Sequence, residues 1–174
     1  MLTRLDRLAD PLRFAATPVL TTLARFAFAA VLLRYYLNSA FTKFDGLGLD
    51  AGAYIQILPK AMEAAGYDPS QLGFVAHLIV FAGAMAEIIL PILLIIGLAT
   101  RPAALGMIVF ILVQSIVDVT GHAVDATTLG AWFDTQSGAL ILDQRLMWIT
   151  VLAIPLMLGG GPLSLDRLIY KRFA

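Results

Sequence analysis

The sequence contains no cysteine, and this excludes several kinds of chemistry at once. Without thiols the chain has no disulfide, no thiolate metal ligand and no thiol redox relay of its own. Histidine is almost as scarce, because only His77 and His122 occur. We expect both near the outer face of a membrane, whereas a haem with two histidine ligands needs them on facing helices and turned inward. The sequence therefore indicates no haem and shows no evident cofactor signature.

Catalytic and phosphate-binding motifs are also missing. The chain has no HExxH, no phosphate-binding loop and no recognisable pair of nucleophile and base. The 12 basic and 12 acidic residues cancel, so there is no basic excess of the kind that nucleic-acid binding requires. We therefore expect no nucleic-acid partner, no metal, and no stand-alone enzyme activity. Asp118, His122 and Asp125 are the one set that would suit a hard metal ion, and solvated loop carboxylates are the alternative interpretation.

Charged residues make up only 14% of the chain, whereas about a quarter is usual in soluble domains. Hydrophobic residues reach 60%. A chain of 174 residues has too little interior to hide so much apolar surface from water. Lipid is the natural solvent for such a composition, and we expect the bilayer to be a direct partner.

Four apolar segments approach or exceed the roughly 20 residues that cross a bilayer as a helix. We predict an all-α integral membrane four-helix bundle, one domain over 1–174. The predicted spans are about 18–44, 71–98, 101–120 and 143–158, and the predicted interfacial amphipathic segments are 1–13, 51–66 and 164–173. Pro59 is expected to bend or start a helix within 51–66. Thr100 and Ser164 are the predicted caps of the helices that follow them.

Basic residues segregate to one side of this predicted topology. That side receives Arg4, Arg7, Arg13, Arg101, Arg167, Lys171 and Arg172. The other side receives Lys43, Lys60 and Arg145 together with most of the carboxylates. Lysine and arginine favour the cytoplasmic face, so we expect both termini in the cytoplasm of a bacterial cell, with the protein in its inner membrane.

The stretch EIILPILLIIGLATRPAAL, from Glu87 to Leu105, resembles the DoxX family of small bacterial membrane proteins. Its pattern is an acidic residue in the second span, a Gly-Leu-x-Thr-Arg turn and then Ala-Ala-Leu. Two further stretches fit the family, namely Arg25 to Phe44 and DQRLMW from Asp143 with the later GPLSLD tail. Family members often carry glycines ahead of the lysine in the first span, whereas this chain has RYYLNSA from Arg34.

The resemblance implies a four-span inner-membrane protein with a loose link to respiratory or sulfur-compound redox chemistry. Relatives include a subunit of a thiosulfate:quinone oxidoreductase. On this basis we expect an accessory subunit of a membrane redox system. Its expected partners are a periplasmic or membrane redox protein or a second copy of the chain, and quinone is the cofactor class that fits.

Ionisable side chains inside a bilayer are costly, and they mark either function or a structural pair. Arg25 in the first span and Glu87 in the second are predicted at depths that allow them to meet, and we predict that Glu87 is buried in the bundle and faces Arg25 or a nearby polar group. One interpretation is a purely structural ion pair that orders the bundle. The other is a proton or ligand site at Glu87.

A second group of polar residues is predicted in the outer leaflet. Gln114, Asp118 and His122 recur at helical spacing on the third span, and Arg34, Asn38 and Thr42 do so on the first. We predict an ion pair between Arg34 and Asp118, with Asp143 as the alternative partner of Arg34. Two interpretations remain open: a pocket for a quinone head group or a small polar or anionic ligand, and a polar network that only specifies the fold. The candidate ligand-binding residues are Arg34, Asn38, Lys43, Glu87, Gln114, Asp118, His122 and Arg145.

Three functions are compatible with these patterns. The first is the accessory redox subunit, which binds its ligand on the outer side or docks a partner there. The second is a small-molecule transporter or permease-like protein, with Glu87 and the arginines as its gate. The third is a non-catalytic membrane scaffold for a partner protein.

Overall fold

The computed structural model describes residues 16–46 and 48–173, which form an all-α bundle. This part of the chain contains four helices long and apolar enough to cross a membrane, Ala16–Phe41, Phe74–Ile96, Thr100–Thr120 and Leu140–Leu158. No more than 28% of the most apolar stretch of each helix is buried inside the bundle, so the outer faces are apolar as well. Helices that are apolar all round suit a lipid environment. The predicted fold class is confirmed, with observed ends within about three residues of those predicted.

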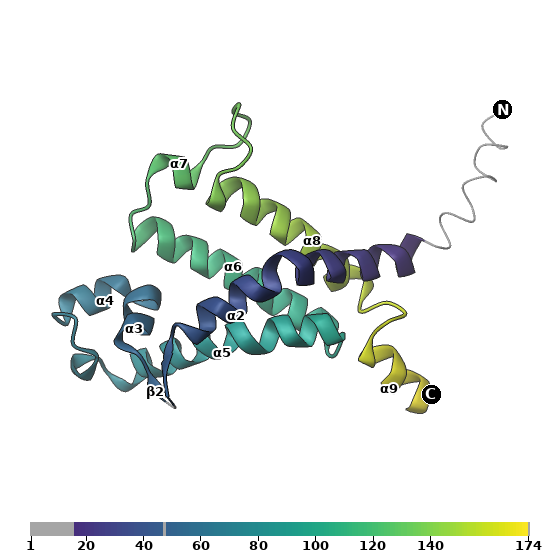
Figure 1. The fold of residues 1–174 in the computed structure, drawn as a ribbon, viewed down its shortest axis with the longest axis horizontal. Coiled ribbons are helices and arrows are strands. Elements are labelled where there is room, and N and C mark those ends of the chain that lie inside the picture. The colour runs from purple at the N-terminus through teal and green to yellow at the C-terminus, as the bar shows by residue number, and fades with distance from the viewer. Residues whose placement is uncertain (1–15, 47, 174) are drawn as a thin grey trace.

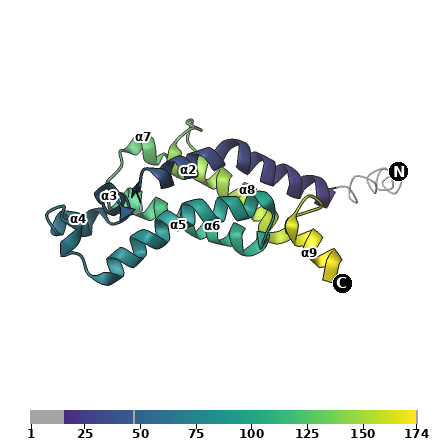
Figure 2. The same cartoon turned by 60° about the horizontal axis from the view of Figure 1, so that its bottom comes forward.

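The bundle places the start of the first span beside the C-terminal helix α9 (Leu165–Phe173) (Figure 1). We name this the α9 end. The opposite end carries the short helices α3 (Ala51–Ile57), α4 (Pro59–Ala64) and α7 (Ala126–Leu129), and we name it the α3 end. Figure 2 shows the same separation from a second direction. The predicted interfacial segment 1–13 lies outside the described residues.

Two of the spans contain a π-helical turn. In the first span this is η1 (Ala29–Leu33), which is followed directly by α2 (Arg34–Phe41). In the fourth span η3 (Leu140–Gln144) precedes α8 (Arg145–Leu158). A π turn holds one more residue than an α turn and shifts the side chains that follow, and such turns are frequent at functional sites.

The segment after the first span covers the α3 end. A short antiparallel pair, β1 (Phe44–Asp45) and β2 (Gly48–Leu49), leads into α3. The side chain of Asp50 caps α3 by accepting a hydrogen bond from the Gly52 N–H at 2.7 Å. The chain then breaks at Leu58 and resumes as α4 with Pro59 in its first turn, which is where the sequence placed the bend.

The second and third spans, α5 (Phe74–Ile96) and α6 (Thr100–Thr120), are joined by a tight turn. Gly97 ends α5 with a φ of +70°, which L side chains rarely adopt, and a Cβ there would lie 2.8 Å from Arg25 Nη2. The prediction of Thr100 as the cap of α6 is wrong. Thr100 is the first residue of α6, and Asp166 of α9 accepts the Ala99 N–H at 2.7 Å and the Thr100 N–H at 2.9 Å. This cap comes from a distant segment, so local sequence does not reveal it.

The apolar core lies nearer the α9 end, where all four spans contribute. Its buried members are Phe28, Leu32, Tyr36, Leu94, Ala103, Ala104, Met107, Ile111 and Leu152. Tyr35 of the first span contacts Trp148 of the fourth with ring centroids 5.6 Å apart. The four helices therefore close on each other, and the space they leave lies toward the α3 end.

Candidate functional site

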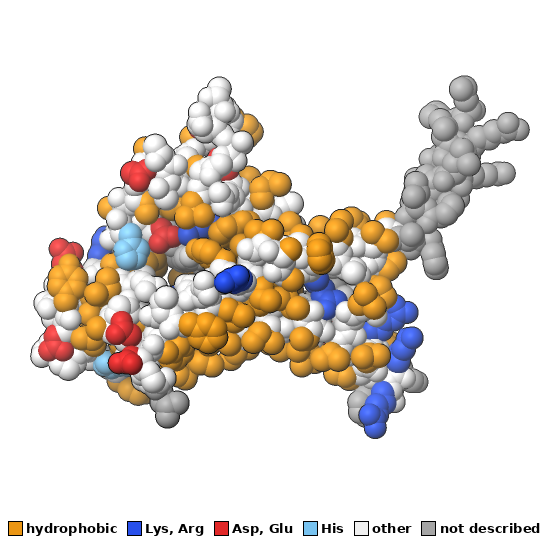
Figure 3. Space-filling view, in the orientation of Figure 1, with side chains coloured by type: hydrophobic (Ala, Val, Ile, Leu, Met, Phe, Trp, Pro, Cys, Tyr) orange, Lys and Arg blue, Asp and Glu red, His pale blue; other side chains and the backbone are white. Residues whose placement is uncertain are grey.

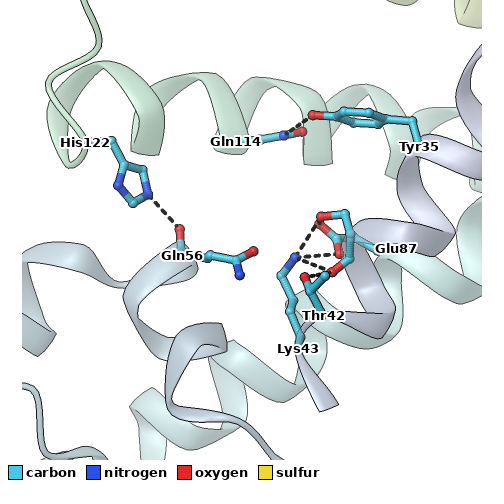
Figure 4. A network of polar contacts seen from close by, with 8 residues as sticks. Tyr35, Thr42, Lys43, Gln56, Glu87, Gln114 and His122 are labelled. Atoms are coloured by element: carbon cyan, nitrogen blue, oxygen red, sulfur yellow. Dashed lines mark hydrogen bonds and ion pairs between the residues drawn. The ribbon is translucent and has the colours of Figure 1, made fainter. Parts of the chain in front are cut away.

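A cavity of about 570 Å³ lies among the spans at the α3 end. Side chains from all four spans line it, and α3 contributes Gln56 and Ile57. Figure 4 shows how several of its polar side chains point toward a common space. The cavity combines apolar walls with a few polar groups, which is the composition typical of small-molecule sites.

Lys43 and Glu87 form a buried ion pair in the wall of this cavity (Figure 4). Lys43 Nζ donates to Glu87 Oε2 at 2.8 Å, to Ser39 Oγ at 2.9 Å and to the Ser39 carbonyl at 3.1 Å. Ser39 Oγ in turn donates to Glu87 Oε1 at 3.2 Å. The three donors of the ammonium all have acceptors, so the charge is held without water.

A second ion pair joins the third and fourth spans. Arg145 Nη2 donates to Asp118 Oδ2 at 2.5 Å, and Arg145 Nη1 donates to Ser115 Oγ at 3.0 Å. The Arg145 side chain is 2% exposed and that of Asp118 is 23% exposed. Both residues line the cavity. Because the fourth span begins at Leu140, Arg145 lies inside that helix rather than at its mouth.

Two further hydrogen bonds lie at the cavity, one from Gln114 of the third span and one from His122 just after the end of α6 (Figure 4). Gln114 Nε2 donates to the Tyr35 hydroxyl at 3.2 Å. His122 Nε2 lies 3.0 Å from the Gln56 carbonyl, and because a carbonyl only accepts, this nitrogen carries the donated hydrogen. These contacts tie α6 to the first span and to α3, on either side of the same space.

Glu87 is buried as predicted, but Arg25 is the wrong partner. Glu87 is buried at 4% exposure, but its partner is Lys43. At about 1.5 Å of rise per residue, Lys43 lies roughly 27 Å further along the first span than Arg25 does. The depth estimate from sequence placed Arg25 too close to the middle of α5.

Arg25 instead makes hydrogen bonds to backbone carbonyls at the α9 end. Its Nε donates to Leu94 O at 2.9 Å, and its Nη1 donates to Gly160 O and Leu163 O, each at 2.6 Å. Its Nη2 donates to Ile95 O. Four of the five guanidinium N–H groups are thereby satisfied by the end of α5 and the loop before α9. This cluster holds the bundle together and lies outside the cavity.

The predicted pair of Arg34 and Asp118 is also wrong, because Asp118 binds Arg145. Asp143, the alternative partner, accepts the Ala139 N–H at 3.0 Å instead. Arg34 and Asn38 are exposed and lie outside the cavity wall. The neighbouring stripe of Tyr35, Ser39 and Lys43 faces the cavity in their place. Helical spacing identifies both stripes, and it does not tell which one a helix turns inward after a π turn.

The other candidate residues gather as predicted around one space. The cavity wall includes Lys43, Glu87, Gln114, Asp118, His122 and Arg145. Sequence reasoning missed Ser115 and Gln56 as participants. Ser115 lies three residues before Asp118 on the same helix, which is a usable signal, whereas Gln56 contributes a backbone carbonyl that no sequence pattern marks.

The family model for DoxX matches residues 20–122, well over half of the chain. The chain belongs to the DoxX family. The matched region includes most of the first span, the whole second and third spans, the Lys43–Glu87 pair and Asp118, while Arg145 lies beyond its end. No curated protein and no solved structure matches the chain significantly. Together with its four apolar helices, the family identifies a multi-pass membrane protein.

The candidate metal ligands make other contacts in this DoxX protein. Asp118 is engaged by Arg145, and Asp125 caps α7 by accepting the Thr127 and Thr128 N–H groups, each at 2.8 Å. Hydrogen bonds from Thr127 and Thr128 lower the pKa of Asp125 to about 2. Over residues 16–46 and 48–173, no three His, Asp or Glu side chains are placed to hold a metal ion.

Proposed function

We propose that this DoxX protein is an accessory subunit of a membrane redox system and that its cavity binds the head group of a quinone. The observation that carries the proposal is the presence of two ion pairs, the buried Lys43–Glu87 and the partly exposed Arg145–Asp118, in the wall of one cavity. The remaining N–H groups of Arg145 and the carboxylate oxygens of Glu87 and Asp118 offer hydrogen bonds to a polar head, while valine, leucine and phenylalanine side chains line the remaining wall.

The cavity is proposed to lie at the outer side of the bacterial inner membrane. Figure 3 shows lysine and arginine gathered over α9, with aspartate and glutamate gathered at the α3 end. The exposed basic residues of the α9 end are Arg101, Arg167, Lys171 and Arg172. The preference of basic residues for the cytoplasm gives an orientation with both termini inside and the cavity near the periplasm. A periplasmic redox partner would then meet the α3 end.

The packing between the cavity and the α9 end argues against a transport role. Phe28, Leu94, Met107, Ile111 and Leu152 are between 0% and 1% exposed. They fill the middle of the bundle with side chains from every span, and the Tyr36 hydroxyl is the one side-chain oxygen in this core cluster of described residues. A permease opens its site to each side in turn, so transport would require this core packing to open toward the α9 end.

The test is a binding and turnover experiment on the full chain. Purified protein is titrated with decylubiquinone, and its thermal unfolding is followed by circular dichroism, because a ligand that binds only the native state raises the melting temperature. Asp118→Asn is the comparison, and its melting temperature is expected to stay unchanged with ligand. Quinol oxidation is then measured in bacterial membranes with and without this chain. Wild-type protein that gains no stability from quinone contradicts the proposal, and liposome uptake of a solute supports transport instead.

A further inference from the structure

The cavity reaches the lipid-facing surface of the bundle between α5 and α6. Three side chains that line the cavity, Ile79, Val109 and Val113, are also 46%, 51% and 53% exposed. A side chain that both borders the cavity and faces outward lies at its rim. Val109 is the tenth of the 21 residues of α6, so this rim is in the middle of a span. The surroundings there are hydrocarbon rather than water.

Small residues widen this rim on the α5 side. Ala82, Gly83 and Ala86 line the cavity on one face of α5, between Ile79 and Glu87. Closer to the α5–α6 turn the two helices touch, because a Cβ on Gly106 would lie 3.0 Å from Leu90 Cδ2. The opening between α5 and α6 therefore begins beyond Leu90 and extends toward the α3 end.

The α3 end of the opening is bridged by α3 and α4. A Cβ on Gly83 of α5 would lie 3.1 Å from Ile57 Cδ1, and one on Gly121 after α6 would lie 2.5 Å from Pro59 Cγ. His122 adds its hydrogen bond to the Gln56 carbonyl. The α3–α4 segment thus contacts α5 and the end of α6 and lies between the cavity and the aqueous side.

The charges in the cavity wall also limit which ligands can bind. Its charged residues are Lys43, Glu87, Asp118 and Arg145, and each cation already contacts a carboxylate. The formal charges of these four residues cancel. An anion would have to compete with Glu87 or Asp118 for its cation, and it would leave a carboxylate unpaired inside the membrane. A neutral polar head meets neither obstacle.

From these observations we infer that the ligand is an uncharged amphiphile that reaches the cavity from the bilayer, through a portal between α5 and α6 rimmed by Ala82, Val109 and Val113. Its head lies against the two ion pairs and its apolar tail extends through the portal into lipid. This inference rests on the proposed function, since it concerns the same site. It adds the route by which the ligand enters, the requirement that the ligand has an apolar tail, and the exclusion of anions from the cavity.

The experiment compares a quinone with a tail and the same head without one. Decylubiquinone and its tail-free dimethoxy-methyl-benzoquinone are titrated against full-length wild type, Val113→Phe and Ala82→Leu. Ile116→Phe is the matched control, because Ile116 is on the same helix, is 61% exposed and lies outside the cavity wall. Binding is followed by the shift in melting temperature in one detergent, so partitioning of the quinone is the same for every variant.

Wild type is expected to bind decylubiquinone more tightly than the tail-free head. Val113→Phe and Ala82→Leu are expected to weaken the binding of decylubiquinone by about tenfold. The control should bind it as wild type does, and the tail-free head should bind all four proteins alike. Sodium thiosulfate should neither bind nor compete.

Equal binding of both quinones by wild type, unchanged decylubiquinone binding in both portal variants, or competition by thiosulfate would each overturn the inference and leave the quinone site standing. Failure of wild type to bind either quinone would overturn the proposed function and this inference together.

Discussion

Lys43 Nζ lies 2.8 Å from Glu87 Oε2, so the charged group at the end of the first span is neutralised by the acidic residue in the middle of the second. The two side chains are 3% and 5% exposed. Ser39 contacts both partners and fixes their geometry. The pair therefore links two spans and shapes the wall of the cavity.

Removing one charge of this pair should destabilise the bundle strongly. Glu87→Gln leaves the Lys43 ammonium buried without its counter-charge, and we expect a loss of about 3–5 kcal/mol in the free energy of unfolding. Thermal or denaturant unfolding in a fixed detergent measures it. Replacing both residues with methionine should restore part of the loss, because no charge is then stranded. Glu63→Gln, at an exposed position of α4, is the control and should unfold as wild type does.

Asp118→Asn should weaken the link between the third and fourth spans. The Arg145 guanidinium would remain buried with Ser115 as its remaining side-chain acceptor among the described residues. We expect a loss of about 1–3 kcal/mol, less than for Glu87, because Asp118 keeps some contact with water. The same unfolding measurement applies, with exposed Asp45→Asn as the control. A larger loss than for Glu87→Gln would contradict the ranking of the two pairs by burial.

Arg25→Lys tests whether the geometry of the guanidinium matters beyond its charge. Lysine keeps the charge but has three donors at one nitrogen, so it does not reach the four carbonyls that Arg25 bridges. We expect a clear drop in melting temperature, because hydrogen bonds to charged groups contribute about 1.5–3 kcal/mol each. Exposed Arg101 donates to one carbonyl, that of Met157, so Arg101→Lys should have little effect. Equal effects of the two variants would contradict the role assigned to Arg25.

Asp166 should make stability depend on acid pH. Partial burial alone would raise the pKa of this carboxyl, but hydrogen bonds from Thr100 and the Ala99 N–H outweigh it and lower the pKa below its ordinary value. A lowered folded-state pKa stabilises the fold above the unfolded-state value of about 3.9, and this contribution is lost as the pH falls through the folded-state pKa. The difference in melting temperature between wild type and Asp166→Asn should therefore be constant near neutral pH and shrink below about pH 4. A difference that stays constant through this acid range would contradict the cap.

The orientation can be checked with reporter fusions. After residue 174, a reporter that works only in the cytoplasm should be active and one that works only in the periplasm should be inactive. Within 122–142 the two reporters should give the opposite result. This follows from the basic residues at the α9 end. A periplasmic C-terminus would reverse the proposed orientation and place the cavity on the cytoplasmic side.

The fold could be predicted from the sequence because each element is marked by residues that are adjacent along the chain. Long apolar runs, the glycine after α5 and the proline at α4 each act locally, so their effects can be recognised without knowing what packs against them. The polar composition of the site was recognised for a similar reason, since Glu87, Asp118 and Arg145 stand out within apolar surroundings.

The ion-pair and hydrogen-bond partners of these residues could not be predicted, because they depend on how each helix is rotated about its axis and how deep each residue lies in the bundle. A π turn directly precedes Arg34, and such a turn shifts the side chains that follow it by an amount that helical spacing does not predict. The early start of the fourth span at Leu140 moves Arg145 into reach of Asp118. The carbonyls that receive Arg25 belong to backbone, and any residue type would provide them.

The contacts of Arg25 also set an order of events during synthesis. The first span is made and enters the membrane long before Gly160 and Leu163 leave the ribosome, yet these two residues supply half of the carbonyls that solvate its guanidinium. Until then the nascent helix carries a charge that the translocon, the lipid head groups or a chaperone must accommodate. The last segment is therefore needed to complete the acceptors of Arg25, and a chain that ends before residue 160 would lack the carbonyls of Gly160 and Leu163.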